Sequence, residues 1–136
     1  METNYFGILR MSQAFAPVLA RNGGGAIVNM LSIASWVQRP TLGIYASTKS
    51  AAWGLTNTLR HELRAQNTQV LGLHMAFVDT DLTRGIDAPK STPEQIVERA
   101  LDALLAGQEE VLADEMTQQV KSGLVAQPPV YLAPLV

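Results

Sequence analysis

Short apolar runs alternate with longer helical patterns along the whole of this chain of 136 residues. The runs at 26–31 and 70–75 are each typical of a strand that is buried on both faces of a sheet. A shorter candidate strand follows at 110–113. Because helical patterns fill the connections, the strands are expected to run parallel and to be joined by crossover helices. The sequence therefore predicts an α/β fold.

Four helices are predicted, at about 4–21 and 44–66, from 93 onward, and at 115–124. Pro17 is expected to bend or shorten the last turn of the first helix. Thr92, Pro93 and Gln95 have the N-cap, first-position proline and capping-box pattern at the start of the third. The core-facing residues expected in the first helix are Ile8, Met11, Phe15, Val18 and Leu19, and those expected in the third are Val97, Leu101, Leu104 and Leu105.

Composition excludes several classes of protein. With 47% hydrophobic and 16% charged residues the chain is expected to be globular, and its length suits one domain at 1–124 followed by a proline-broken apolar tail at 125–136. A net charge of −2 without a basic cluster argues against nucleic acid as a partner. No apolar stretch is long enough to cross a membrane. The absence of cysteine fits a cytoplasmic protein.

Polar side chains gather where the first predicted strand ends. Ser32 follows that strand directly, and Tyr45 and Lys49 begin the next helix. Residues four apart share one helix face, so an ammonium lies beside a phenol, and a nearby positive charge favours the phenolate. Taken alone, the pair has a simpler interpretation, a half-buried tyrosine with a solvated lysine one turn later. Together with the Ser32 hydroxyl, at the sheet edge where ligands bind in such folds, it predicts an acid/base site for a carbonyl or an alcohol.

The ordered set Asn4, Ser32, Tyr45 and Lys49 resembles the short-chain dehydrogenase/reductase family over about residues 4–114. The segments that carry the resemblance are Asn4-Tyr5-Phe6-Gly7, Ile27-Val28-Asn29-Met30-Leu31-Ser32, Tyr45-Ala46-Ser47-Thr48-Lys49 and Val78-Asp79-Thr80. The resemblance implies a carbonyl/alcohol oxidoreductase that uses NAD or NADP, and a dimer or larger homo-oligomer.

The family's chemistry implies a role for each of these residues. Tyr45 would exchange the proton at the substrate oxygen, and Ser32 would donate a hydrogen bond to that oxygen. Lys49 would hold the nicotinamide ribose beside Tyr45, and Asn4 would hold a water that relays protons. Val78 and Thr80 would contact the nicotinamide carboxamide.

Two departures from the family pattern modify these expectations. Met75-Ala76 stands where the family usually has Pro-Gly, so a positive φ at Ala76 would be strained. No glycine-rich turn leads from a strand into a helix, and Gly23-Gly24-Gly25 follows a helix and is expected to form a tight turn. The chain thus resembles a partial Rossmann-like, doubly wound parallel sheet, that is, the C-terminal half of a dinucleotide-binding fold. Either it is a truncated product, or the rest of the fold is supplied elsewhere. We expect weak or no cofactor binding by the chain alone, and exposure of the edge of the serine strand.

Four apolar residues near the site are candidates to line a substrate pocket: Trp36, Leu42, Phe77 and Leu82. Trp36 fits equally well as an anchor of its loop. Asp79 and Asp81 are not expected to bind a metal without further ligands. His61 and His74 are interpreted as a surface helix residue and a strand residue.

Three hypotheses follow from the sequence. The first is an NAD(P)-dependent oxidoreductase of this family with a tyrosine acid/base. The second is a truncated, catalytically silent fragment that acts only in oligomerisation or interaction. The third is an unrelated α/β domain in which the four polar residues coincide by chance.

Overall fold

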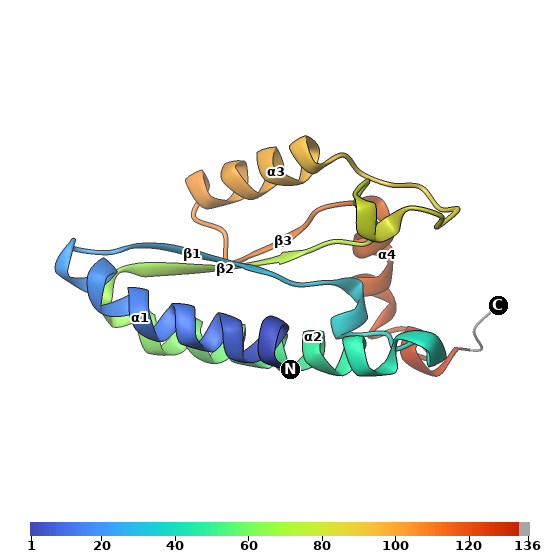
Figure 1. The fold of residues 1–136 in the computed structure, drawn as a ribbon, viewed down its shortest axis with the longest axis horizontal. Helices are drawn as coiled ribbons and strands as arrows, with labels where there is room; N and C mark the ends of the chain where they lie inside the picture. Colours follow the sequence, from blue (N-terminus) through green and yellow to red (C-terminus); the bar gives the residue numbers. More distant parts are fainter. Residues whose placement is uncertain (134–136) are drawn as a thin grey trace.

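The computed structural model describes residues 1–133 as a three-stranded parallel sheet in the order β1-β2-β3, with helices on both faces (Figure 1). The strands are β1 (Gly25–Met30), β2 (Thr68–His74) and β3 (Glu110–Leu112), and the helices are α1 (Gly7–Arg21), α2 (Gly43–Leu63), α3 (Pro93–Leu105) and α4 (Glu115–Gly123). The predicted α/β fold is confirmed. The last three residues of the expected tail, 134–136, lie outside the described residues.

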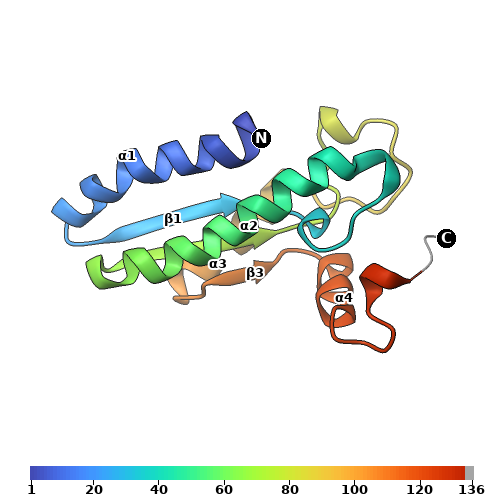
Figure 2. The same cartoon turned by 90° about the horizontal axis from the view of Figure 1, so that it is seen from below.

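The helices form two layers around the sheet. α1 and α2 cover one face, and α3 covers the other (Figures 1 and 2). α4 lies beyond the carboxyl end of β3, beside the loop that follows β1. This arrangement brings the loops after β1 and β2 and the start of α2 to one end of the sheet. None of the helices in the described chain has the length and apolarity needed to cross a bilayer.

The two longer strands differ in burial, which corrects one expectation. Leu71 and Leu73 of the central strand β2 are at most 2% exposed, and they pack with Ile96 of α3 in the main core. β1 is less buried than its apolar run predicts, since Ala26 and Met30 are exposed, and this agrees with the expected exposure of the edge of the serine strand. The reason is position, because β1 lies at the edge of the sheet and, within residues 1–133, only β2 pairs with it.

The first helix ends at a glycine turn. α1 continues through Pro17 to Arg21, so the proline does not shorten it. Gly23 and Gly24 have φ values of +83° and +128°, and a Cβ on Gly24 would lie 2.4 Å from the carbonyl oxygen of Asn67. The predicted tight turn between α1 and β1 is therefore confirmed.

Three of the four residues predicted for the core face of α3 lie outside the core, and only Leu104 packs against it. Val97 and Leu101 are 55% and 54% exposed, and Leu105 is 89% exposed. The residues that α3 buries against the sheet are Ile96, Ala100 and Ala103, with half-buried Leu104 beside them. The buried row is one residue out of phase with the expected stripe, because small alanines allow the helix to approach the sheet closely. Its larger side chains are left on the outside.

The capping box at the start of α3 is present as predicted. Thr92 Oγ1 accepts from Gln95 N at 3.3 Å, and Thr92 N donates to Gln95 Oε1 at 3.0 Å. Replacing Thr92 by alanine should lower the free energy of unfolding by about 1 kcal/mol, measured by urea denaturation. Thr58→Ala is the control, because this exposed mid-helix hydroxyl bonds only the carbonyl of Gly54 in its own helix. Equal losses in both variants would contradict the capping role.

Candidate active site

Ser32 lies just beyond β1, where the parallel ladder continues past the end of the strand. Leu31 N donates to Leu73 O at 2.8 Å, and Ile33 N donates to Met75 O at 3.0 Å, so both neighbours of Ser32 are bonded to the β2 side. Ser32 then caps a single helical turn by accepting from Ala34 N at 3.1 Å. The Ser32 hydroxyl therefore keeps its own proton available for donation.

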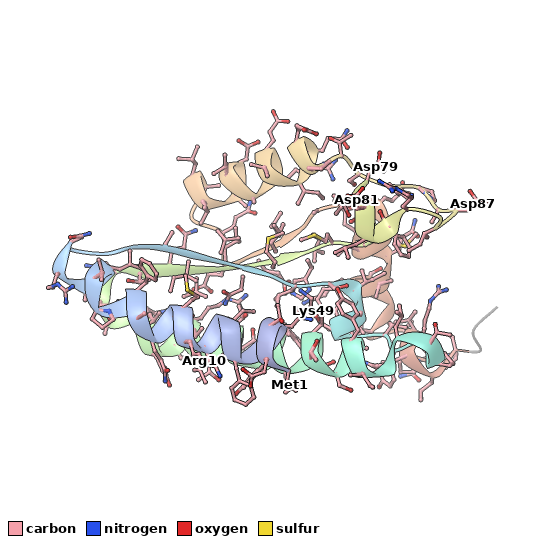
Figure 3. The ribbon with its side chains drawn as sticks, viewed as in Figure 1. Met1, Arg10, Lys49, Asp79, Asp81 and Asp87 are labelled. Atoms are coloured by element: carbon pink, nitrogen blue, oxygen red, sulfur yellow. The ribbon has the colours of Figure 1, made fainter. Side chains whose placement is uncertain are left out.

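Tyr45 and Lys49 lie on the first turns of α2, and Lys49 reaches the end of β1. Lys49 Nζ donates to the carbonyl oxygen of Met30 at 2.7 Å and lies 5.9 Å from the centre of the Tyr45 ring. Burial lowers the pKa of Lys49 from its usual value, because desolvation disfavours the charged amine. Figure 3 shows Lys49 between the N-terminal end of α1 and the sheet. Tyr45 is 40% exposed, which leaves room for a ligand beside it.

Asn4 joins the same group from the π-helical turn Glu2–Phe6. Its Nδ2 donates to Thr48 Oγ1 at 3.0 Å, and that hydroxyl donates to the carbonyl oxygen of Tyr45 at 2.7 Å. Asn4 is thus linked to the turn of α2 that carries Tyr45 and Lys49. The structure links Asn4, Tyr45 and Lys49 around the first turns of α2, and Lys49 bonds the last residue of β1, two residues before Ser32 in the chain. Within residues 1–133, no hydrogen bond joins the Ser32 and Tyr45 side chains directly.

The loop after β2 contains the predicted cofactor contacts. Val78 is half-buried against the main core and forms an isolated parallel bridge with Ser91, while Thr80 is exposed and caps the helical turn Asp81–Thr83. Ala76 does not have a positive φ, so the strain anticipated for the Met75-Ala76 pair is absent. Its backbone N–H instead donates to Asp114 Oδ2 at 2.8 Å, which ties the loop to the start of α4.

The predicted pocket residues occupy three different environments. Trp36 is 6% exposed and stacks on His74, so it anchors its loop, the second of the two roles considered for it. Phe77 is half-buried, and Leu82 is 94% exposed. Asp79 and Asp81 are exposed on the same loop, where Figure 3 labels them, and the described chain contains no group of side chains suited to a metal ion.

A cavity of about 680 Å³ runs between α1 and β1 and reaches Lys49 at one end. Asn4 lies beside Lys49 there, and the rest of the lining is largely apolar, with Ile8, Phe15 and Ile27 among it. Five consecutive residues of β1, 26–30, line the cavity, and α1 lies beside β1 at the open edge of the sheet (Figure 2). Sequence reasoning anticipated the exposed strand edge but not this cavity. It also missed the contacts of His74, because no local pattern marks a histidine that is to be buried next to Ser32.

A doubly wound parallel sheet with these side chains at its carboxyl edge is the architecture of Rossmann-like oxidoreductases. Residues 1–91 match the family model described as short chain dehydrogenase, and this chain belongs to that family. The unrelated-domain hypothesis is therefore wrong.

Three relatives show how far the similarity extends. Short-chain dehydrogenase PC-15 of Penicillium crustosum is 44% identical over 79 residues, which cover 58% of this chain and 29% of the relative. A short chain dehydrogenase from Burkholderia cenocepacia J2315 in complex with NADP is 36% identical, with a TM-score of 0.91 over 98% of this chain and 58% of that one. A 7 alpha-hydroxysteroid dehydrogenase complexed with NADH and 7-oxo glycochenodeoxycholic acid is 26% identical, with a TM-score of 0.72 over 79% of this chain and 49% of that one. The chain therefore spans about half the length of these two solved structures.

Proposed function

We propose that this chain is the catalytic portion of an NAD(P)-dependent oxidoreductase that interconverts a carbonyl and a secondary alcohol. The observation that carries the proposal is the position of the Lys49 amine. The amine donates a hydrogen bond to the carbonyl oxygen of Met30, the last residue of β1, and lies 5.9 Å from the centre of the Tyr45 ring. Met30 precedes Ser32 by two residues in the chain. A cation, a phenol and a hydroxyl at one strand end suit proton exchange at an oxygen.

Each side chain has a distinct task in the proposal. Tyr45 gives or takes the proton at the substrate oxygen, and Ser32 donates a hydrogen bond to that oxygen as charge develops on it. Lys49 favours the ionised phenol by its positive charge. Asn4, bonded to Thr48 beside Lys49, holds a water that relays protons to solvent.

The residues present fit the nicotinamide end of a dinucleotide. When bound, the nicotinamide supplies or accepts the hydride. Lys49 uses one N–H for Met30 and has two left for ribose hydroxyls. Val78 and Thr80, on the loop after β2, contact the carboxamide. Phe77 and Leu82 line the apolar side of the substrate site.

In this proposal, a nucleotide-binding half that is not among these residues completes the domain. No strand in the sequence is followed by a glycine-rich turn into a helix that would cradle a pyrophosphate. The unpaired edge of β1 and the apolar cavity beside it fit a further parallel strand and its helix. Residues 1–124 then form the C-terminal part of the domain, and 125–136 its tail. The absence of cysteine supports a cytoplasmic location, and the exposed apolar side chains of α1 and α3 support a homo-oligomer.

The test is a titration of NADH and NADPH fluorescence, carried out on this chain and on a polypeptide that adds a nucleotide-binding half. The longer polypeptide should show a saturable change, and this chain alone a weak one or none. Lys49→Met in the longer polypeptide should raise the cofactor Kd about 10- to 100-fold, the value of a charge-assisted hydrogen bond. Arg99→Met is the matched control, because it removes an exposed positive charge on α3.

The alternative is a catalytically silent fragment that serves oligomerisation or interaction, and the open edge of β1 favours it. It predicts no saturable change of fluorescence in either polypeptide, together with a defined assembly by light scattering. Equal cofactor affinity in Lys49→Met and Arg99→Met would contradict the role proposed for Lys49.

A further inference from the structure

Ser32 is held not only through its side chain but also through its backbone carbonyl oxygen. It accepts from Ser35 N at 2.9 Å, which closes the helical turn after β1. A carbonyl oxygen has two lone pairs, so one further donor can bind it. That donor adds a further restraint to the peptide plane after Ser32, whose Ile33 N–H already donates to Met75 O at 3.0 Å, and so helps to set where the Ser32 hydroxyl points.

His74 is the side chain that reaches this carbonyl. It is the last residue of β2 and is 0% exposed. Its Nδ1 lies 3.5 Å from Ser32 O, and its Nε2 lies 3.5 Å from Glu110 Oε1 without a hydrogen bond. The proposed acid/base chemistry makes no use of this buried ring, so its position calls for another explanation.

Trp36 contacts the His74 ring directly, and Lys121 of α4 and Glu110 of β3 lie around this pair. The Trp36 ring stacks on it with centroids 4.0 Å apart and an angle of 20° between the planes. Lys121 Nζ of α4 lies 4.7 Å from the Trp36 centroid and 2.9 Å from Glu110 Oε2. Lys121 Nζ contacts both Glu110 carboxylate oxygens, at 3.0 and 2.9 Å, so this carboxylate is paired with a cation without the imidazole proton.

We propose that His74 is a positioning residue for Ser32: a neutral imidazole that carries its proton on Nδ1 and donates it to the Ser32 carbonyl. This inference rests on the proposed function of Ser32. Trp36 fixes the plane of the ring, and the Glu110–Lys121 pair closes the site on its other side. The active-site hydroxyl is thereby coupled to β3 and α4, which themselves contribute no group to the reaction.

The tautomer can be read without any turnover, from long-range ¹⁵N–¹H NMR spectra of the chain labelled at histidine. We expect the Nδ1–H form of the buried ring, assigned by its loss in His74→Asn. A ring protonated on Nε2, or on both nitrogens at neutral pH, would overturn the proposal.

The kinetic test uses two substitutions at His74 in the polypeptide with a nucleotide-binding half. An asparagine amide nitrogen branches from the same Cγ as Nδ1, so His74→Asn keeps a donor near the Ser32 carbonyl. His74→Leu removes it. We expect His74→Leu to lower kcat by about ten- to a hundredfold with an unchanged KM for cofactor, and His74→Asn to restore most of the loss. His61→Leu, which removes the exposed histidine of α2, is the control.

A double-mutant cycle separates this proposal from the proposed function. If His74 acts through Ser32, adding His74→Leu to Ser32→Ala should lower kcat no further. Losses that multiply in the double variant would refute the positioning role while leaving the function of Ser32 intact. If Ser32→Ala alone turns over like the wild type, the proposed function fails first, and the positioning role fails with it.

Discussion

Replacing Tyr45 by phenylalanine is expected to lower kcat by about 10²- to 10⁴-fold in the polypeptide with a nucleotide-binding half. The change removes one hydroxyl from a side chain that is 40% exposed and has Lys49 Nζ 5.9 Å from its ring centre. The ring itself remains, so the lysine keeps its position and the cofactor should bind with nearly the same affinity. The loss is therefore expected in kcat, measured by the absorbance of the reduced nicotinamide.

Tyr131→Phe is the matched control for this experiment. Tyr131 is 52% exposed and lies in the helical turn Val130–Leu132, well after α4 in the sequence. Removing its hydroxyl should leave both kcat and KM as they are in the wild type. A Tyr45→Phe protein that keeps its turnover would show that another group exchanges the proton, and a Tyr131→Phe protein that loses it would point to general disruption.

The sequence predicted those parts of the fold that depend on local patterns. Apolar runs and helix caps placed the elements to within a few residues, and the capping box at Thr92 was correct in detail. The spacing of Tyr45 and Lys49 was sufficient to put both on one face of α2. The contact of Lys49 with the end of β1 followed from the rule that parallel strands present their carboxyl ends at one edge.

The errors occurred where burial depends on which other elements are present. The row Val97, Leu101 and Leu105 has the right period for a core stripe, yet these side chains are exposed because Ile96, Ala100 and Ala103 face the sheet. Periodicity identifies a helix, and by itself does not choose between two adjacent apolar rows. The apolar run of β1 by itself predicts burial on both faces, and the exposure of this strand was expected only from the missing glycine-rich unit that would supply its neighbour.

The surroundings of His74 were equally invisible in the sequence. Glu110 and Lys121 follow it by tens of residues. The pairing of β3 with β2 brings Glu110 within 3.5 Å of the ring, and Lys121 of α4 pairs with Glu110 there. The loop-anchor role of Trp36 likewise became clear only from its stack on this histidine. Tertiary contacts of this kind leave no spacing for a motif to reveal.

The buried imidazole should also make folding sensitive to mild acid. Burial lowers the pKa of His74 from 6.5 to about 4, with positive Lys121 and Arg60 adding to the effect and Glu110 and the Ser32 carbonyl opposing it. Between these two values the unfolded chain binds a proton at His74 and the native chain does not. Stability from this group is therefore complete above the unfolded pKa and falls as the pH drops toward the folded one.

From about pH 7 to about pH 5, His74 should account for a loss of about 2 kcal/mol in the free energy of unfolding. The measurement is urea denaturation at both pH values for the wild type, His74→Asn and His61→Asn. His74→Asn should lose about 2 kcal/mol less than the wild type over this interval, while His61→Asn should follow the wild type, because its ring is exposed on α2. If the wild type and His74→Asn lose the same amount, the ring takes up its proton in the native state as well. In that case burial does not keep the imidazole neutral, and Glu110 compensates its charge inside the fold.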